Sequence, residues 1–209
     1  MTRNDIVQII NSHKLVVVIR LNKQEYIPKV VDALVAGGIK VLEITSNTPG
    51  FLEEIAKART KYPNVLVGAG TVINSEIANR AVTAGAQFLV TPNTNAKVVE
   101  VAHKNNVPVL MGALTPTEIC RAVEIGADII KLFPIASMGV KYFKAVKGPL
   151  SEVKFFAVGG MAIDTIPEWK GAGVEGFGLG GNLVKPIHNQ SDFDSIVSLA
   201  KDVIKTIHE

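Results

Sequence analysis

The sequence predicts a (β/α)8 barrel, and three observations support this fold. The chain has 209 residues, close to the lower size limit of about 200 for such a barrel. Eight short aliphatic runs recur along it, at intervals of about twenty residues, the spacing of strands joined by crossover helices. Four of the intervening segments end in the same glycine-containing pattern. We therefore expect one domain over residues 1–209, because a chain of this length has room for one hydrophobic core.

The eight runs are rich in β-branched and aliphatic residues, as expected for parallel strands buried on both faces. In chain order they are Leu15–Ile19, Lys40–Ile44, Val65–Gly68, Phe88–Val90, Val107–Met111, Asp128–Leu132, Lys154–Val158 and Val174–Gly178. A doubly wound open sheet is the competing architecture. However, the glycine-rich stretch 68–72 lacks the third glycine of the dinucleotide-binding fingerprint.

The segments between the runs have helical periodicity and recognisable ends. Before the first run, apolar residues at Ile6, Ile9 and Ile10 predict an additional helix over 4–12 that lies across the bottom of the barrel. Thr115 and Thr48, each followed by proline, are predicted helix starts. A glycine in the left-handed conformation is expected to stop four helices just before the next strand, at 35–38, 83–86, 124–127 and 171–174.

Composition excludes several classes of protein. A hydrophobic fraction of 47% with 20% charged residues indicates a folded chain and not a disordered one. The longest aliphatic run, Leu15–Ile19, is far shorter than the roughly 20 residues that span a bilayer. Arg3, Asp5 and Gln8 occupy the place of a signal peptide's apolar stretch, so we expect a cytoplasmic location and no membrane partner. The net charge of +3 comes from interspersed basic and acidic residues, which favours small anions over nucleic acid as partners.

Neither cysteine nor histidine is arranged to bind a metal. The single Cys120 follows Ile119 in a helical segment, and we expect a buried, inert thiol there. The four histidines are scattered, with no second ligand at a suitable spacing on one helix face. We therefore expect neither a metal nor any other cofactor.

Two charged residues interrupt predicted core strands. Alternation along 129–133 places Lys131 on the face opposite Leu132, and alternation along 41–45 places Glu43 opposite Leu42. If the leucines meet the outer helices, Lys131 and Glu43 point into the barrel. Burial lowers a lysine pKa, and a neutral amine is a nucleophile toward carbonyl groups. Glu43 would then shuttle protons. The residues alone leave two other interpretations open. Lys131 could extend to solvent, or Lys131 and Glu43 could form a structural ion pair.

Other polar residues follow the strands at the end where barrels carry their active sites. Arg20 is suited to an anionic group of a substrate, or is a rim arginine bonded to loop carbonyls. Thr71 and Pro92 close the third and fourth strands and are weak signals alone. Consecutive glycines follow the last two strands, where barrels often bind phosphate. They are Gly159, Gly160, Gly180 and Gly181.

Five motifs together resemble the KHG/KDPG aldolase family: residues 43–45 (Glu-Ile-Thr), 68–72, 131–134 (Lys-Leu-Phe-Pro), 148–149 and 158–160. They keep their order over nearly the whole chain. The resemblance implies a cofactor-free class I aldolase that cleaves 2-keto-3-deoxy-6-phosphogluconate to pyruvate and glyceraldehyde 3-phosphate. Members of the family often also cleave 4-hydroxy-2-oxoglutarate to pyruvate and glyoxylate, so the resemblance implies this activity as well. The partner is thus a small phosphorylated 2-keto acid, and family members are typically homotrimers.

Carried onto this chain, the resemblance makes Lys131 the Schiff-base lysine and Glu43 the acid/base. Thr71 would hold the carboxylate of the pyruvate part, Pro92 and Phe133 would wall the site, and the four glycines would bind phosphate. Asn47 stands where many members have a substrate-binding arginine, which gives Arg20 a larger share in binding the substrate carboxylate.

Two further features bear on the substrate. Asn182 replaces the usual serine after the last glycine pair, and its amide can still donate to phosphate. Residues 47–49 and 91–93 are similar to the 2-dehydro-3-deoxy-6-phosphogalactonate aldolase branch. Thr45 and residues 115–118 look more like the gluconate branch. The alternatives to an aldolase are a non-catalytic barrel that binds a phosphorylated ligand and an isomerase or epimerase of phosphorylated sugars.

Overall fold

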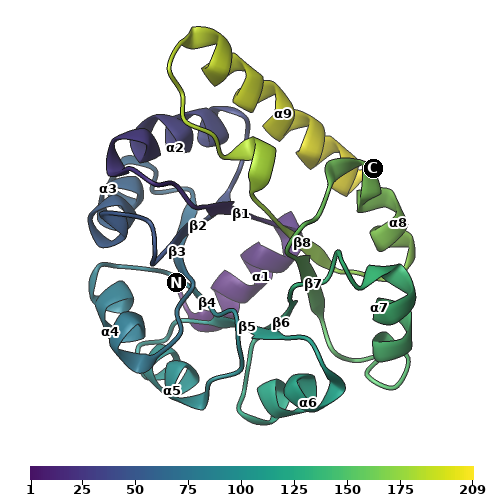
Figure 1. Ribbon diagram of the computed structural model, residues 1–209. Coiled ribbons are helices and arrows are strands. Elements are labelled where there is room, and N and C mark those ends of the chain that lie inside the picture. The colour runs from purple at the N-terminus through teal and green to yellow at the C-terminus, as the bar shows by residue number, and fades with distance from the viewer.

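The computed structural model describes residues 1–209 apart from the side chain of Asn182, and its strands close into one parallel barrel in the order β1 to β8. Figure 1 shows the barrel end-on, with helices around it. This confirms the predicted (β/α)8 fold, the TIM barrel, and excludes the open sheet. The strands are β1 (Leu15–Ile19), β2 (Val41–Thr45), β3 (Leu66–Gly70), β4 (Leu89–Val90), β5 (Val109–Ala113), β6 (Ile129–Leu132), β7 (Phe155–Val158) and β8 (Gly176–Leu179).

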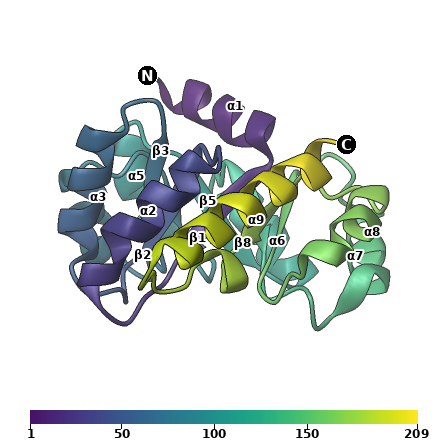
Figure 2. The same ribbon diagram turned by 90° about the horizontal axis from the view of Figure 1, so that it is seen from above.

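A helix follows every strand, and one more precedes the first. The outer ring consists of α2 (Ile27–Ala36), α3 (Phe51–Lys61), α4 (Ser75–Thr83), α5 (Ala96–Lys104), α6 (Pro116–Glu124), α7 (Gly139–Lys147), α8 (Ile166–Gly171) and α9 (Gln190–His208). Three short 3-10 turns are η1 (Gln24–Tyr26), η2 (Ile163–Thr165) and η3 (Gly181–Leu183). The first helix, α1 (Arg3–His13), lies across one end of the barrel, as expected (Figure 2). Among the described residues, we find no helix with the length and apolar character needed to cross a membrane.

Most of the predicted helix ends are confirmed. One glycine in each of the four patterns has a φ between 90° and 97°, a conformation that L-residues rarely adopt. The Thr115 hydroxyl accepts a hydrogen bond from the Glu118 amide at 3.3 Å, and the Glu118 carboxylate accepts one from the Thr115 amide at 2.8 Å. These two bonds form a capping box at the start of α6.

Two local predictions were wrong. Thr48 does not cap α3, which begins at Phe51 after Gly50, because the Thr48 hydroxyl is buried and contacts Thr45 instead. Cys120 is exposed, not buried. It lies on α6 one residue after Ile119, and a rotation of about 100° per residue carries it away from the buried face of the helix.

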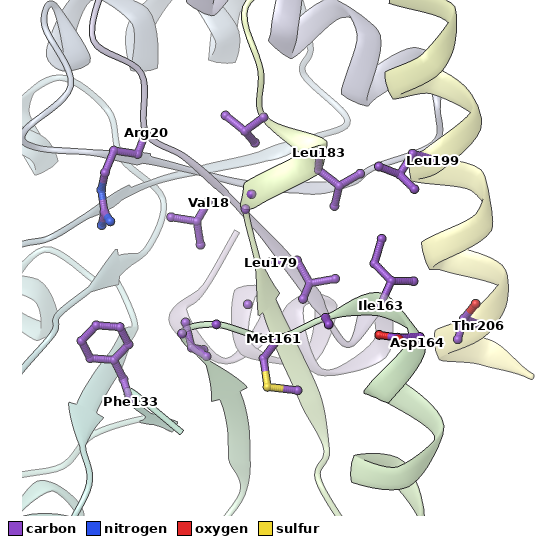
Figure 3. Close-up of a pocket in the computed structure, with 18 of the residues that line it drawn as sticks. Val18, Arg20, Phe133, Met161, Ile163, Asp164, Leu179, Leu183, Leu199 and Thr206 are labelled. Atoms are coloured by element: carbon purple, nitrogen blue, oxygen red, sulfur yellow. The ribbon is translucent and has the colours of Figure 1, made fainter. Parts of the chain in front are cut away.

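The core has two layers that follow from strand alternation. Residues such as Leu42 and Leu132 pack between the sheet and the outer helices. Residues on the other face fill the barrel interior, where Phe88 and Phe156 are the large side chains, and Ile10 of α1 closes its floor. The opposite end of the interior opens toward Arg20 and Phe133 (Figure 3).

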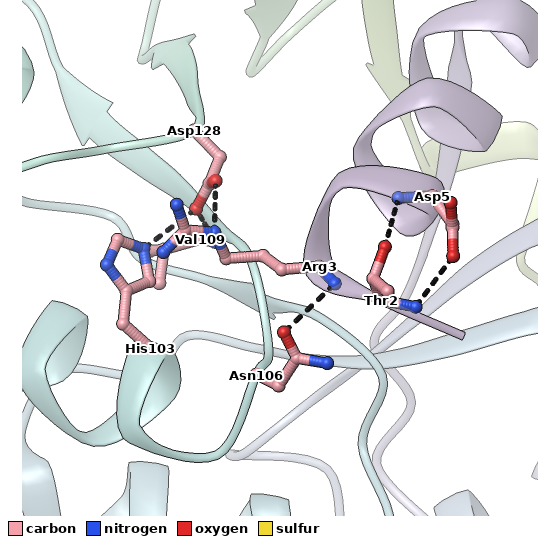
Figure 4. Close-up of polar contacts among 7 residues, drawn as sticks. All are labelled: Thr2, Arg3, Asp5, His103, Asn106, Val109 and Asp128. Carbon is pink, nitrogen blue, oxygen red and sulfur yellow. Dashed lines mark hydrogen bonds and ion pairs between the residues drawn. The ribbon is translucent and has the colours of Figure 1, made fainter.

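Polar contacts around Asp128 hold α1 against the barrel (Figure 4). The Asp128 side chain is 8% exposed and pairs with Arg3 of α1 through an Nε–Oδ1 distance of 3.2 Å. Its other oxygen accepts the Val109 amide at 2.9 Å and contacts His103 Nε2 at 3.0 Å. The Arg3 amide also donates to Asn106 at 3.2 Å. One carboxylate therefore joins α1, α5 and the start of β5.

We expect an Asp128→Ala variant to lose about 2–3 kcal/mol of unfolding free energy, because it leaves the amide of buried Val109 without its acceptor and removes the contacts to Arg3 and His103. Urea denaturation measures the change. The matched control is Glu124→Ala, which removes the exposed ion pair between Glu124 and Arg121 and should change stability little. Equal losses in the two variants would show that the Asp128 contacts add nothing beyond a surface ion pair.

Candidate active site

The two charged residues of the strands lie inside the barrel, where alternation predicts them. Lys131 on β6 is 6% exposed and Glu43 on β2 is 2% exposed, whereas their neighbours Leu132 and Leu42 pack against the outer helices. The barrel thus encloses two titratable groups among aliphatic and aromatic side chains. One comes from β2 and the other from β6.

The environment of both groups favours their neutral forms. Burial lowers the pKa of the Lys131 amine, the charge of Arg20 lowers it further, and Glu43 opposes the change. Burial raises the pKa of the Glu43 carboxyl, against the opposing charges of Lys131 and Arg20. Lys131 Nζ also lies 4.7 Å from the centre of the Phe133 ring. A buried amine with a lowered pKa is a candidate nucleophile at neutral pH.

Glu43 and Lys131 are neighbours without forming a direct pair. Among the described side chains, no ion pair within 4.0 Å joins them, although each affects the other's pKa. A structural ion pair would be held in contact to offset the cost of burying two charges. The geometry therefore disfavours the interpretation of these residues as a structural pair.

A glycine on β3 makes room for the acid. Gly70 lies against Glu43, and a Cβ at this position would overlap the carboxylate oxygen Oε1. Gly68 on the same strand is overlain in the same way by the Phe88 ring. The sequence showed a glycine-rich stretch at 68–70, but its function as a seat for side chains of the neighbouring strands needs the barrel geometry.

Arg20 and Thr71 come together at the open end. The Arg20 Nη2 donates to the Thr71 hydroxyl at 3.3 Å. Thr71 has a φ of 56°, an unusual conformation for a β-branched residue. Such strained residues tend to occur at functional sites, where the surrounding structure holds them. The contact places a guanidinium and a hydroxyl side by side at the open end of the barrel.

A cavity of about 1040 Å³ opens at this end of the barrel. Arg20, Lys131 and Phe133 line it, and so do the four predicted phosphate-binding glycines. Gly159, Gly160 and Gly181 have φ values of 95°, 78° and 53°. Both glycine loops therefore meet at one cavity wall. The side chain of Asn182, predicted to help bind phosphate, lies outside the described part of the chain.

Four predicted residues are not among the described residues that line this cavity: Glu43, Asn47, Thr71 and Pro92. Glu43 lies deeper in the barrel, 2% exposed, and Thr71 reaches the cavity edge through its contact with Arg20. Pro92 follows β4 and packs its backbone against Gly112 of β5, and Asn47 is exposed on the loop after β2. The cavity also extends further than the sequence indicated, past Ile163 and Leu183 to Leu199 and Thr206 of α9 (Figure 3). No sequence motif marks this extension.

The described side chains include no cluster of three His, Cys, Asp or Glu residues that could hold a metal ion. The groups assembled here are an amine, a carboxyl, a guanidinium and glycine-rich loops. Together they suit an anionic carbonyl compound that also carries a phosphate group.

Comparison with protein families gives a match over residues 6–199 to the model of the KDPG and KHG aldolases. The chain belongs to this family of aldolases. It is therefore a lyase.

Known members of the family with similar sequences have different substrates in their names. The aldolase is 32% identical over 200 residues to a 2-dehydro-3-deoxy-phosphogluconate aldolase of Dickeya dadantii, covering 94% of this chain and 93% of that one. It is 36% identical over 157 residues to a 2-dehydro-3-deoxy-6-phosphogalactonate aldolase of Escherichia coli, covering 74% and 77%.

A solved structure of the KDPG aldolase from Legionella pneumophila holds pyruvate captured as a covalent carbinolamine. It superposes on the aldolase described here with a TM-score of 0.83 at 27% identity, covering 94% of this chain and 97% of that one.

Proposed function

We propose that this chain is a class I aldolase in which Lys131 forms an imine with the C2 carbonyl of a phosphorylated 2-keto-3-deoxy acid. The leading substrate is 2-keto-3-deoxy-6-phosphogluconate, cleaved to pyruvate and glyceraldehyde 3-phosphate. The same chemistry would cleave 4-hydroxy-2-oxoglutarate to pyruvate and glyoxylate. The observation that carries the proposal is the buried Lys131 amine, which has a lowered pKa and lines the cavity, together with the buried Glu43 carboxyl, whose charge acts on it.

The reaction begins with the neutral Lys131 amine. Its nitrogen forms a bond to C2, and the carbonyl oxygen leaves as water after it is protonated, which gives an iminium ion. Glu43, whose pKa is raised by burial, supplies that proton. The iminium then carries a fixed positive charge close to Glu43, which favours the ionised carboxylate for the next step.

Cleavage uses the iminium as an electron sink. The Glu43 carboxylate takes the proton of the C4 hydroxyl, the C3–C4 bond breaks, and its electron pair forms an enamine. The aldehyde fragment, which still carries the phosphate group, then leaves the site. Glu43 returns the proton to C3, and water attacks the resulting iminium to release pyruvate and the free amine. No other electron donor or acceptor is needed.

Substrate recognition would divide between the two sides of the cavity. Arg20 and Thr71 are in contact at 3.3 Å and present donors to the carboxylate of the keto acid. The glycine loops on β7 and β8 present backbone amides to the phosphate. The Legionella relative supports a covalent route through pyruvate, because its structure holds pyruvate as a carbinolamine.

Trapping tests the covalent step. Incubation with pyruvate and borohydride should attach a reduced adduct to Lys131, detected as a mass increase on the peptide that contains Phe133. Lys147 is the internal control, because its side chain is 20% exposed and paired with Glu175 at 2.6 Å, and it should stay unmodified. An unmodified Lys131 peptide, under conditions that trap a known class I aldolase, contradicts the proposal.

A second candidate substrate is the galactonate epimer, 2-dehydro-3-deoxy-6-phosphogalactonate. Asn47 in place of an arginine, and the 36% identity to the E. coli galactonate enzyme, favour it. A side-by-side assay of both epimers, with pyruvate release as the readout, distinguishes them. Activity confined to 4-hydroxy-2-oxoglutarate would show that the glycine loops do not bind a substrate phosphate.

The pH dependence of kcat/KM should be bell-shaped. Imine formation needs the neutral amine, whose fraction grows as pH rises through the lowered Lys131 pKa, and a proton donor, whose fraction falls as pH rises through the raised Glu43 pKa. The limb that reports Lys131 should therefore lie below the ordinary lysine value of 10.5, and the limb that reports Glu43 above the ordinary value of 4.5. They report apparent values of a coupled pair. A rate of pyruvate release that still rises above about pH 10 would show an unperturbed lysine.

A further inference from the structure

The loop that follows Glu43 contacts the ends of both neighbouring strands. On the β1 side, the Thr45 and Thr48 hydroxyls lie 2.9 Å apart, and both side chains are buried. Thr45 Oγ1 donates to the Ile19 carbonyl at 3.3 Å, and the Leu21 amide donates to Thr48 Oγ1 at 3.3 Å. Thr48 can then donate to Thr45, so that each hydroxyl gives and accepts one hydrogen bond. This chain fixes the residues on both sides of Arg20.

On the β3 side, the same loop holds Thr71 through Ser46. The Ser46 hydroxyl donates to the Thr71 carbonyl at 2.8 Å, and the Ser46 amide donates to the Gly70 carbonyl at 2.8 Å. Thr71 has the unfavourable φ of 56°, which persists only where surrounding contacts impose it. Ser46 supplies such a contact next to the strained peptide.

We propose that Ser46, Thr45 and Thr48 are positioning residues that set the Arg20–Thr71 pair to bind the carboxylate of the keto acid. The inference rests on the proposed function, because it assigns the carboxylate to that pair. Asn47, between these residues, has an exposed side chain, whereas Arg20 lines the cavity and donates to Thr71 at 3.3 Å. The loop acts on binding by holding Arg20 and Thr71 in this mutual contact.

A Ser46→Ala variant separates positioning from a merely structural effect. Loss of one hydrogen bond should raise the pyruvate concentration that half-saturates trapping about three- to ten-fold. The limiting trapping rate should stay within about two-fold, because Lys131 and Glu43 are untouched. Trapping of acetone, which has no carboxylate, should be unchanged. The ratio of the two ketones is the readout that a general loss of stability would not move.

Three further variants complete the experiment. Ser46→Thr keeps the hydroxyl and should restore pyruvate binding, and Thr48→Val should weaken it through the β1 side. Ser12→Ala is the matched control, because it removes another serine hydroxyl bonded to a carbonyl, that of Ile9 at 2.9 Å, near the barrel floor.

The outcomes separate the two proposals. If the unaltered enzyme forms no adduct with pyruvate, the aldolase mechanism fails. If it is trapped but Ser46→Ala leaves half-saturation unchanged, or weakens pyruvate and acetone equally, the positioning role is overturned. If Ser46→Ala does not fold, an unchanged preference for pyruvate in Thr48→Val overturns it.

Discussion

A Lys131→Met variant should lose turnover by a factor of about 10⁵ or more, since it removes the proposed nucleophile and with it the covalent route. Methionine is close in length to lysine and apolar, so it fits a side chain that is 6% exposed among aliphatic neighbours. The loss corresponds to about 7 kcal/mol in the activation free energy. Pyruvate release at saturating substrate measures it.

Trapping of the unaltered enzyme and turnover of this variant together distinguish the classes of function. An isomerase or epimerase that used Glu43 as its base would show no adduct on Lys131 in the unaltered enzyme. A binding barrel would have no activity to lose. Circular dichroism and urea denaturation should show a retained fold in the methionine variant. If that variant released pyruvate at near the normal rate, another group would have to be the nucleophile.

The second large effect concerns Glu43, the proposed acid/base. Glu43→Gln keeps the size of a side chain that is 2% exposed but removes its ability to transfer a proton. Proton-transfer catalysis typically contributes 10²–10⁴-fold, and we expect a loss of about that size in kcat. Borohydride should still trap pyruvate on Lys131, because the amine stays in place.

Glu54 provides a matched control for this substitution. It is also a buried carboxyl, 3% exposed, but it lies on α3 and contacts Gln24 and Lys57 at 2.8 and 2.9 Å. Glu54→Gln should retain turnover. Nearly full activity in Glu43→Gln would mean that the inward carboxyl is structural and that another group or a bound water moves the proton.

The sequence was sufficient to predict the barrel and to place Lys131 and Glu43 on the strand faces opposite Leu132 and Leu42, because residues alternate along a strand. That these faces point inward was conditional on the leucines meeting the outer helices, which the structure shows. Glycine clusters after the last two strands likewise indicated one shared edge. These signals are local, with periods of two residues or with glycine at a fixed place after a strand.

Contacts between strands could not be predicted in this way. The sequence says nothing of the hydrogen bonds from Ser46 to Thr71 or from Arg20 to Thr71, because they join residues 25 and 51 positions apart. Thr48 shows a related limit: beside a proline it resembles a helix cap, but its buried hydroxyl contacts Thr45 at the end of β2 and accepts a hydrogen bond from the Leu21 amide after β1. The predicted burial of Cys120 was wrong, because the rotation from residue to residue along the helix decides which side chains are buried, and the apolar neighbours in the sequence do not.

The seat that Gly70 provides for Glu43 constrains how this enzyme can diversify. Any side chain at Gly70 would displace the Glu43 carboxyl, so we expect substitutions at Gly70 to be incompatible with the proposed proton transfer. The distant cavity wall, with Ile163, Leu183 and Leu199, carries no comparable constraint. Changes in substrate range, whether by natural drift or by directed evolution, should therefore accumulate at these apolar residues, while β2, β3 and the glycine loops after β7 and β8 stay unaltered.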